Sequence, residues 1–268
     1  MNRNINIKTL LFIVAVSFSF SFMKQDKPKK LVVKTKVDYF ATDNLGNVYA
    51  VKDYELIKYL LSGKLFARYS NLKLGNITTV DATNPLKLLL YYRDFQQIIF
   101  LDNQLTTNSE PISLETLGYE QTDLVCASAN NSFWIYNKQN NELVRFNEAS
   151  KKITATGNLK QVLQADLKPN FMIEHNGFLF LNSPETGIFV FDIFGTFNKI
   201  ISLKNLKRFD VNDEIIYFQK DSTFCSYNYR LFEEVCKNNC KAEQINYAKN
   251  RLYKSYNDSI IIEPLTPN

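Results

Sequence analysis

The stretch NSFWIYNKQNNELVRFNE, from Asn131 to Glu148, contains the only tryptophan in this chain of 268 residues. Two apolar runs, rich in aromatic and β-branched residues, lie on either side of a polar tip, KQNN. Such residues favour strands, and a short polar segment between two of these runs is typical of a hairpin. The stretch therefore predicts a pair of short antiparallel strands.

The same pattern recurs along the chain. A polar tip followed by an apolar residue and then an aromatic residue occurs six times, and the aromatic members are Tyr49, Tyr91, Trp134, Phe180, Tyr217 and Tyr253. These residues are separated by 42, 43, 46, 37 and 36 positions. A second aromatic marker follows each of the first five after 9 to 12 positions, at Tyr59, Phe100, Phe146, Phe191 and Tyr227. The intervals match the length of one four-stranded propeller blade.

Further apolar runs precede every marked hairpin and follow the first five, which gives four strands per unit. The sixth unit ends without a fourth strand, whereas KLVVKTK, residues 30–36, is an extra strand before the first unit. A ring closes if this N-terminal strand completes the last blade and so pairs the free edges. The sequence thus predicts an all-β fold, a six-bladed β-propeller forming a single domain over residues 30–268. The alternative is a β-sandwich or a two-domain all-β protein with accidental spacing.

The first unit, DNLGNVYAVKDYELIKYLLSGKLFARYS, resembles the NHL repeat, which runs from an aspartate through a Gly-Asn tip to a tyrosine, an apolar strand and a glycine turn. The matching positions are Asp43, Gly46, Asn47, Tyr49, Ile57, Tyr59 and Gly63. Later units keep the apolar and aromatic positions but lose the Gly-Asn tip. The resemblance implies a six-bladed propeller, a fold that hosts binding modules, scaffolds and hydrolases and therefore does not select a function.

The N-terminus has the layout of a secretory signal. Arg3 and Lys8 precede an apolar run that ends among small residues, and a polar segment containing proline follows. The run from Thr9 to Met23 is shorter than the roughly 20 apolar residues of a membrane span, which favours cleavage over retention as an anchor. We therefore expect a signal peptide at residues 1–22. The mature chain, without an integral membrane span, is expected in the periplasm, on the cell surface or outside the cell.

The charges do not predict a nucleic-acid partner. The chain has 32 lysine and arginine residues against 27 aspartate and glutamate residues, a net charge of +5, and the basic residues are scattered among acidic and amide side chains. Nucleic-acid-binding proteins usually gather basic residues on one face.

The four cysteines have two interpretations. Cys236 and Cys240 are close enough in sequence for a disulfide across a tight loop, which an oxidising compartment would permit, and free thiols are the alternative. A structural zinc site is disfavoured because no second close cysteine pair and only one histidine are present. Cys126 and Cys225 lie in apolar strand patterns and are expected to be buried.

No catalytic set is visible in the sequence. The single histidine, His175, lies in a predicted turn, where exposure to solvent is the usual outcome. Propeller hydrolases with a similar fold bind calcium through carboxylates at the channel mouth, and the predicted inner strands offer Asp81, Glu174 and Asp210 for this role. The alternative is that these carboxylates stabilise turns. No cofactor is expected otherwise.

Two functions follow from these observations. The first is an exported, non-enzymatic interaction module that binds a protein or a glycan, as part of a bacterial envelope or secretion assembly. The second is a calcium-dependent lactonase or esterase that uses the channel carboxylates. Exposed aromatic residues would indicate a binding face, and Tyr92, Phe95 and Trp134 are the candidates, although packing between blades is the usual role of such residues.

Overall fold

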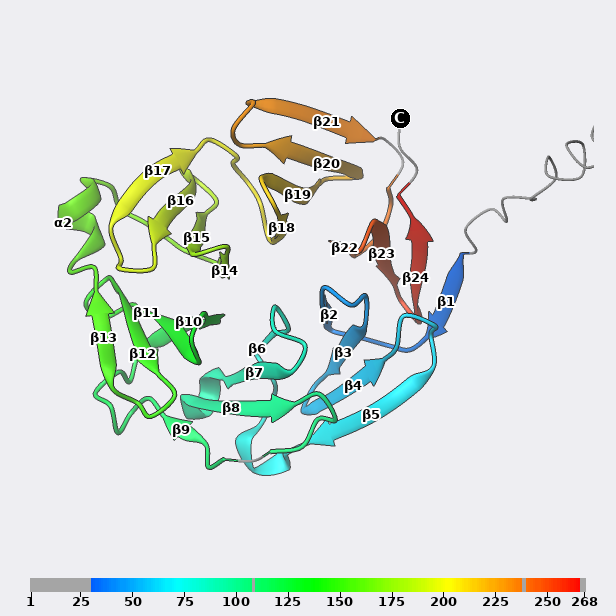
Figure 1. Ribbon diagram of the computed structural model, residues 1–268, viewed down its shortest axis with the longest axis horizontal. Helices are drawn as coiled ribbons and strands as arrows, with labels where there is room; N and C mark the ends of the chain where they lie inside the picture. The colour runs from blue at the N-terminus through cyan, green and yellow to red at the C-terminus, as the bar shows by residue number, and fades with distance from the viewer. Residues whose placement is uncertain (1–29, 108, 238–239, 266–268) are drawn as a thin grey trace, which may run out of the picture.

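The computed structural model describes residues 30–107, 109–237 and 240–265. Within these residues, six antiparallel sheets of four strands each stand in a ring around a central axis, with one short helix, α2 (Leu159–Leu163), on a link between sheets. Figure 1 shows the blades arranged in a ring around a central axis. The six-bladed propeller predicted from the repeated hairpins is confirmed. The predicted signal peptide lies outside the described residues.

The first three blades follow the chain order from the innermost strand to the outermost. Blade 1 holds β2 (Tyr39–Thr42), β3 (Val48–Lys52), β4 (Glu55–Tyr59) and β5 (Leu65–Ser70). Blade 2 holds β6 (Thr79–Asp81), β7 (Lys87–Tyr92), β8 (Gln97–Asp102) and β9 (Ile112–Ser113). Blade 3 holds β10 (Thr122–Ser128), β11 (Ser132–Asn137), β12 (Glu142–Asn147) and β13 (Lys152–Ala155). The 3-10 turn η1 (Leu72–Leu74) lies on the link from blade 1 to blade 2, and η2 (Arg93–Phe95) joins β7 to β8.

The remaining blades complete and close the ring. Blade 4 holds β14 (Phe171–His175), β15 (Phe178–Ser183), β16 (Gly187–Asp192) and β17 (Phe197–Ile201). Blade 5 holds β18 (Phe209–Asn212), β19 (Ile215–Lys220), β20 (Thr223–Asn228) and β21 (Glu233–Lys237). Blade 6 combines β22 (Gln244–Ala248), β23 (Arg251–Tyr256) and β24 (Ser259–Pro264) with β1 (Leu31–Lys34) as its outermost strand. Leu31 pairs with Ile262 and Lys34 with Ser259, which confirms that the N-terminal strand completes the last blade.

The repeated aromatic residues lie where two blades pack together. All six first markers fall on the second strand of their blades, and the most exposed of them retains only 7% of its surface. A second strand is covered on both faces by its neighbours, so β11 is buried at all six positions, whereas the outermost strands β5 and β21 are largely exposed. This burial explains why the middle strands are continuously apolar instead of strictly alternating.

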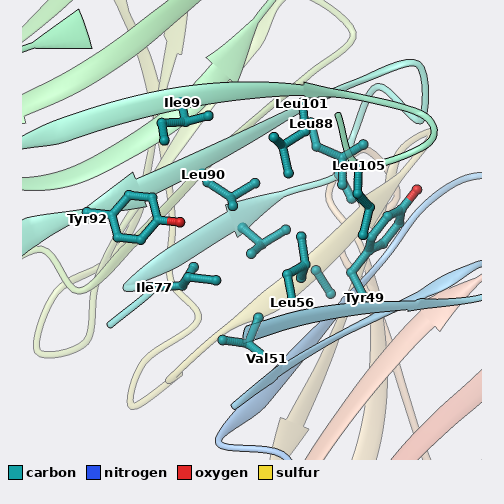
Figure 2. Close-up of a cluster of buried hydrophobic side chains, with 13 residues drawn as sticks. Tyr49, Val51, Leu56, Ile77, Leu88, Leu90, Tyr92, Ile99, Leu101 and Leu105 are labelled. Atoms are coloured by element: carbon teal, nitrogen blue, oxygen red, sulfur yellow. The ribbon is translucent and has the colours of Figure 1, made fainter. Parts of the chain in front are cut away.

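Six clusters of buried apolar side chains are found among the described residues, one at each junction between blades. Figure 2 shows the cluster between blades 1 and 2, in which Tyr49, Leu56 and Leu88 pack together. The hydrophobic core is therefore distributed around the ring. Burial of apolar side chains contributes about 25 cal/mol per Å² of surface removed from water, so every junction adds to the stability of the closed ring.

The Gly-Asn tip of blade 1 helps to close the ring. The Asp43 carboxylate accepts hydrogen bonds from the Asn47 amide groups and from the Tyr49 hydroxyl. Tyr253 of blade 6 donates its hydroxyl hydrogen to the carbonyl oxygen of Gly46 at 3.0 Å. Gly46 has a φ of +86°, and a Cβ there would lie 2.9 Å from the Tyr253 hydroxyl oxygen. This position therefore requires glycine both for its backbone conformation and for the close contact.

The propeller has two distinct faces. One face carries the turns between the first and second strands of each blade and between the third and fourth strands; we call it the tip face. Residues 43–47 and 229–232 are examples. The opposite face carries the turns between the second and third strands and the links between blades; we call it the linker face. Residues 53–54 and 202–208 are examples. No helix in the described part of the chain is long and apolar enough to cross a membrane.

Candidate functional site

The three carboxylates predicted for calcium lie on innermost strands. Asp81 ends β6, Glu174 lies in β14 and Asp210 lies in β18. Asp81 and Asp210 line the narrow central channel, which encloses a cavity of about 60 Å³. Sequence reasoning thus predicted the place of these residues in the fold.

Asp81 joins blade 2 to blade 3. Its Oδ2 accepts a hydrogen bond from the backbone N–H of Ala127 at 2.8 Å, and its Oδ1 accepts from the backbone N–H and the hydroxyl of Thr83 at 2.9 and 2.7 Å. Burial raises the pKa of the Asp81 carboxyl, and the hydrogen bonds oppose this shift.

Glu174 joins blade 4 to blade 3. Its Oε1 accepts from the backbone N–H of Ala129 at 2.8 Å, and its Oε2 accepts from the indole Nε1–H of Trp134 at 2.7 Å and from the Ser128 hydroxyl. The Ser128 oxygen in turn accepts from Nε of the buried Arg145 at 2.8 Å. The only tryptophan of the chain is therefore part of a buried polar network between two blades.

Asp210 joins blade 5 to blade 6, because its Oδ2 accepts from the backbone N–H of Tyr247 at 2.7 Å. Burial raises the pKa of the Asp210 carboxyl to about 7. Gln244 makes the equivalent connection from blade 6 to blade 1, donating to the Phe40 carbonyl at 2.7 Å and accepting from the Phe40 backbone N–H at 3.2 Å. These polar side chains hold neighbouring blades together through the backbone of their inner strands.

The three carboxylates do not converge on one point. Among the residues that the structure describes, the one group of three metal-ligating side chains with donor atoms within 4.8 Å of one another is Cys225, Glu234 and Cys236. Its two cysteines are joined in a disulfide, which removes them as thiolate ligands. A shared calcium site at Asp81, Glu174 and Asp210 does not fit this arrangement.

The possible disulfide between Cys236 and Cys240 is wrong, and the alternative of free thiols holds for Cys240 but not for Cys236. Cys236 pairs instead with Cys225, and the Cys240 thiol is free and buried. Strand register explains the difference, because Cys225 of β20 lies directly opposite Cys236 of β21. Cys126 and Cys225 are buried, as expected.

His175 is the last residue of β14. Its Nε2 is buried and has no hydrogen-bond partner among the described residues, and burial lowers the pKa of the imidazole. The side chain is thus less exposed than its turn position suggested.

The linker-face mouth of the channel holds an arginine that the sequence did not indicate. The guanidinium carbon of Arg208 lies 5.1 Å from the ring centre of Tyr39 and 5.3 Å from that of Phe171, so the group contacts aromatic rings from blades 1 and 4. No sequence motif marks Arg208, because these partners are far from it in the chain.

The most exposed apolar side chains lie mainly on the tip face. Of the three aromatic residues considered as surface candidates, Tyr92 and Trp134 are buried and Phe95 is exposed. On the tip face of blades 4 and 5, Phe194, Leu231 and Phe232 expose 70%, 64% and 77% of their surface. We call these three residues the apolar tips.

Phe232 also has an unusual backbone conformation. Its φ is +61°, in the left-handed region that bulky residues rarely occupy. The corresponding turns of blades 1 and 4 use glycine in this region, at Gly63 and Gly195. Blades 2 and 3 place Leu105 and Ser150 there, with φ values of +62° and +61°, so the positive φ recurs in these turns, and Phe232 differs from the other residues at this position in being both aromatic and exposed.

The comparisons with known proteins identify the fold of this chain but do not assign it to a family. No protein-family model matches the chain, and no curated protein matches its sequence. A streptogramin B lyase structure is similar with a TM-score of 0.55 and 12% identity, over 83% of this chain and 77% of that one. The WD40 domain of Neurospora crassa Pan2 gives a TM-score of 0.57 and 9% identity, over 86% of this chain and 80% of that one. An extracellular domain from B. thetaiotaomicron gives a TM-score of 0.56 and 10% identity, over 84% of this chain and 32% of that one.

Proposed function

We propose that this chain is an exported, non-enzymatic interaction module that binds a protein partner through the tip face of blades 4 and 5. The observation that carries the proposal is the group of apolar tips, Phe194, Leu231 and Phe232. Large exposed apolar side chains on one face of a protein can indicate an interaction site, and aromatic residues supply much of the binding energy in protein interfaces. Phe232 is the most exposed of the large apolar side chains in the described part of the chain, at 77% of its surface.

The neighbouring turns are held in place for such a role. Lys199 of blade 4 donates a hydrogen bond to the carbonyl oxygen of Tyr229 at 3.4 Å, and its ammonium nitrogen lies 4.5 Å from the centre of the Tyr229 ring. Asn228 accepts two backbone hydrogen bonds through its side chain, from Arg230 and from Leu231. A turn fixed in this way loses little conformational freedom on binding.

The Cys225–Cys236 disulfide supports export, because disulfides form and persist in oxidising compartments. Our proposal places the chain in the periplasm, on the cell surface or outside the cell, within a bacterial envelope or secretion assembly. The NHL-like character of the first blade stays a prediction from its sequence.

The bonding of the channel carboxylates supports a non-enzymatic role. Asp81, Glu174 and Asp210 each accept a backbone N–H from a neighbouring blade, so calcium coordination would compete with contacts that hold the ring together. The calcium-dependent hydrolase is therefore the less favoured alternative. Elemental analysis of protein purified in calcium tests it directly: one calcium per chain would favour the hydrolase.

Affinity purification from native envelopes tests the proposed function. Three forms of the tagged protein are compared: wild type, a tip variant carrying Phe194→Ser, Leu231→Ser and Phe232→Ser, and a linker-face control carrying Leu72→Ser and Phe95→Ser. We expect a protein partner to co-purify in equal amount with wild type and control and to be lost from the tip variant. Equal recovery with the tip variant would contradict the proposed face. A bound polysaccharide that survives protease treatment would show a glycan partner instead.

A further inference from the structure

A second cavity, separate from the apolar tips, lies at the linker-face mouth of the channel. Its volume is about 130 Å³, and residues from blades 2, 3, 4 and 5 line it. Its two charged lining residues are Arg93 and Arg208, and no carboxylate lines it. Thr78, Thr79 and Asn170 supply the other polar groups, while the remaining lining residues are apolar.

The donors of Arg208 are unused. Two aromatic rings contact its guanidinium, and among the described residues this group makes no hydrogen bond or ion pair. Contacts with ring faces constrain a guanidinium while leaving its N–H groups free in its own plane. Arg208 therefore presents the planar donor set that binds carboxylate and phosphate oxygens in a bidentate manner.

The backbone that carries Arg208 is fixed by amide side chains. Asn182 donates to the Leu206 carbonyl at 2.7 Å, and Asn170 donates to the carbonyls of Leu206 and Lys207 at 3.1 and 3.3 Å. These bonds hold the segment immediately before Arg208 against blade 4. A site on a fixed segment requires little ordering when a ligand binds.

Arg93 supplies a second positive charge. Its backbone N–H donates to the Thr78 hydroxyl oxygen at 3.1 Å, which fixes the start of η2 beside the cavity. Its guanidinium is exposed and makes no hydrogen bond or ion pair within the part of the chain that the structure describes. Asp38, Asp221 and Glu243 line an adjoining cavity that Arg208 also lines. The Arg208 charge also acts on Asp210, where it partly opposes the rise in pKa that burial causes.

We propose that this cavity binds a small oxyanion, a carboxylate or a phosphate group, with Arg208 as the bidentate donor and Arg93 as the second cation. A water molecule occupies about 30 Å³ in the liquid, so the cavity has room for an anionic group of several heavy atoms. The absence of a lining carboxylate means that no charge of the cavity wall repels such a ligand.

Calorimetric titration of the full mature chain with inorganic phosphate and, separately, with acetate tests this proposal. The variants are Arg208→Gln and Arg93→Gln, with Arg230→Gln as a matched control that removes an arginine charge on the tip face. We expect saturable binding of one anion per chain, weakened at least tenfold in each cavity variant and unchanged in the control. The tighter of the two probes identifies the preferred oxyanion.

An Arg208→Lys variant separates bidentate binding from general charge attraction. Lysine keeps the charge but lacks the planar donor set, so we expect its affinity to stay well below that of wild type. Thermal unfolding of every variant shows whether it folds. If the Arg208 variants do not fold, the anion affinity of Arg93→Gln tests the proposal. Failure of both probes to bind wild type up to 10 mM, about the weakest affinity such a site would serve, would overturn the proposal. An equal loss in the Arg230→Gln control would do the same.

Discussion

Replacement of Glu174 by alanine tests whether the inner-strand carboxylates hold the blades together. The substitution removes the acceptor of three hydrogen bonds, from Ala129, Ser128 and Trp134. A buried donor left without a partner costs about 1–3 kcal/mol, and the three losses share one network, so they do not add fully. Arg145, which is buried and bonded to Ser128, also loses a nearby negative charge. We expect the free energy of unfolding to fall by about 3–5 kcal/mol.

Urea denaturation followed by tryptophan fluorescence measures this change, because the only tryptophan lies in the network. The control is Glu185→Ala, which breaks an exposed ion pair with Lys168 and should cost about 0.5 kcal/mol or less. Glu174→Gln keeps an acceptor of similar size and should recover part of the loss. A Glu174→Ala value within about 1 kcal/mol of the control would refute the structural role, given the cost of unpaired buried donors.

Three further predictions concern other parts of the ring. Burial raises the pKa of the Asp210 carboxyl from 3.8 to about 7, so between these pH values the native state retains a proton that the unfolded state has lost. The free energy of unfolding should therefore fall as pH rises across this interval. Denaturation curves should show the stability of Asp210→Asn relative to wild type increasing from pH 4 to pH 7. Non-reducing peptide mapping should recover Cys225 linked to Cys236, and Cys236→Ser should lower the free energy of unfolding by about 2–3 kcal/mol, whereas a Cys236–Cys240 peptide would contradict the structure. Phe232→Gly should raise the free energy of unfolding by about 0.5–1 kcal/mol, because glycine accepts a positive φ, and it should also abolish partner binding. Clear destabilisation would show instead that the Phe232 side chain has a packing role.

The repeat and the closure of the ring could be predicted from the sequence because they depend on local composition. Trp134 and its counterparts lie on strands buried on both faces, so the same type of residue recurs in every blade. The incomplete sixth unit and the unpaired segment at residues 30–36 indicated their pairing, since a free sheet edge is unfavourable.

The roles of individual side chains could not be predicted, because they depend on contacts between blades. The sequence placed Asp81, Glu174 and Asp210 on inner strands, but they accept hydrogen bonds from backbone N–H groups of neighbouring blades, 37 to 46 residues away. Only the register of β20 against β21 brings Cys225 opposite Cys236.

The residues that carry both proposals had no sequence signal. Arg208 meets Tyr39 and Phe171 only through closure of the ring. Phe232 is distinguished by its exposure, which composition does not reveal.

The most direct test of the interaction-module account is photo-cross-linking in living cells with p-benzoylphenylalanine at position 232 and, as a control, at position 72. Leu72 is nearly as exposed as Phe232, with 72% against 77% of its surface, but lies on the linker face. The account predicts one discrete protein cross-linked from position 232 and not from position 72, identified by mass spectrometry. The same pattern from both positions, or no product from position 232, would contradict it.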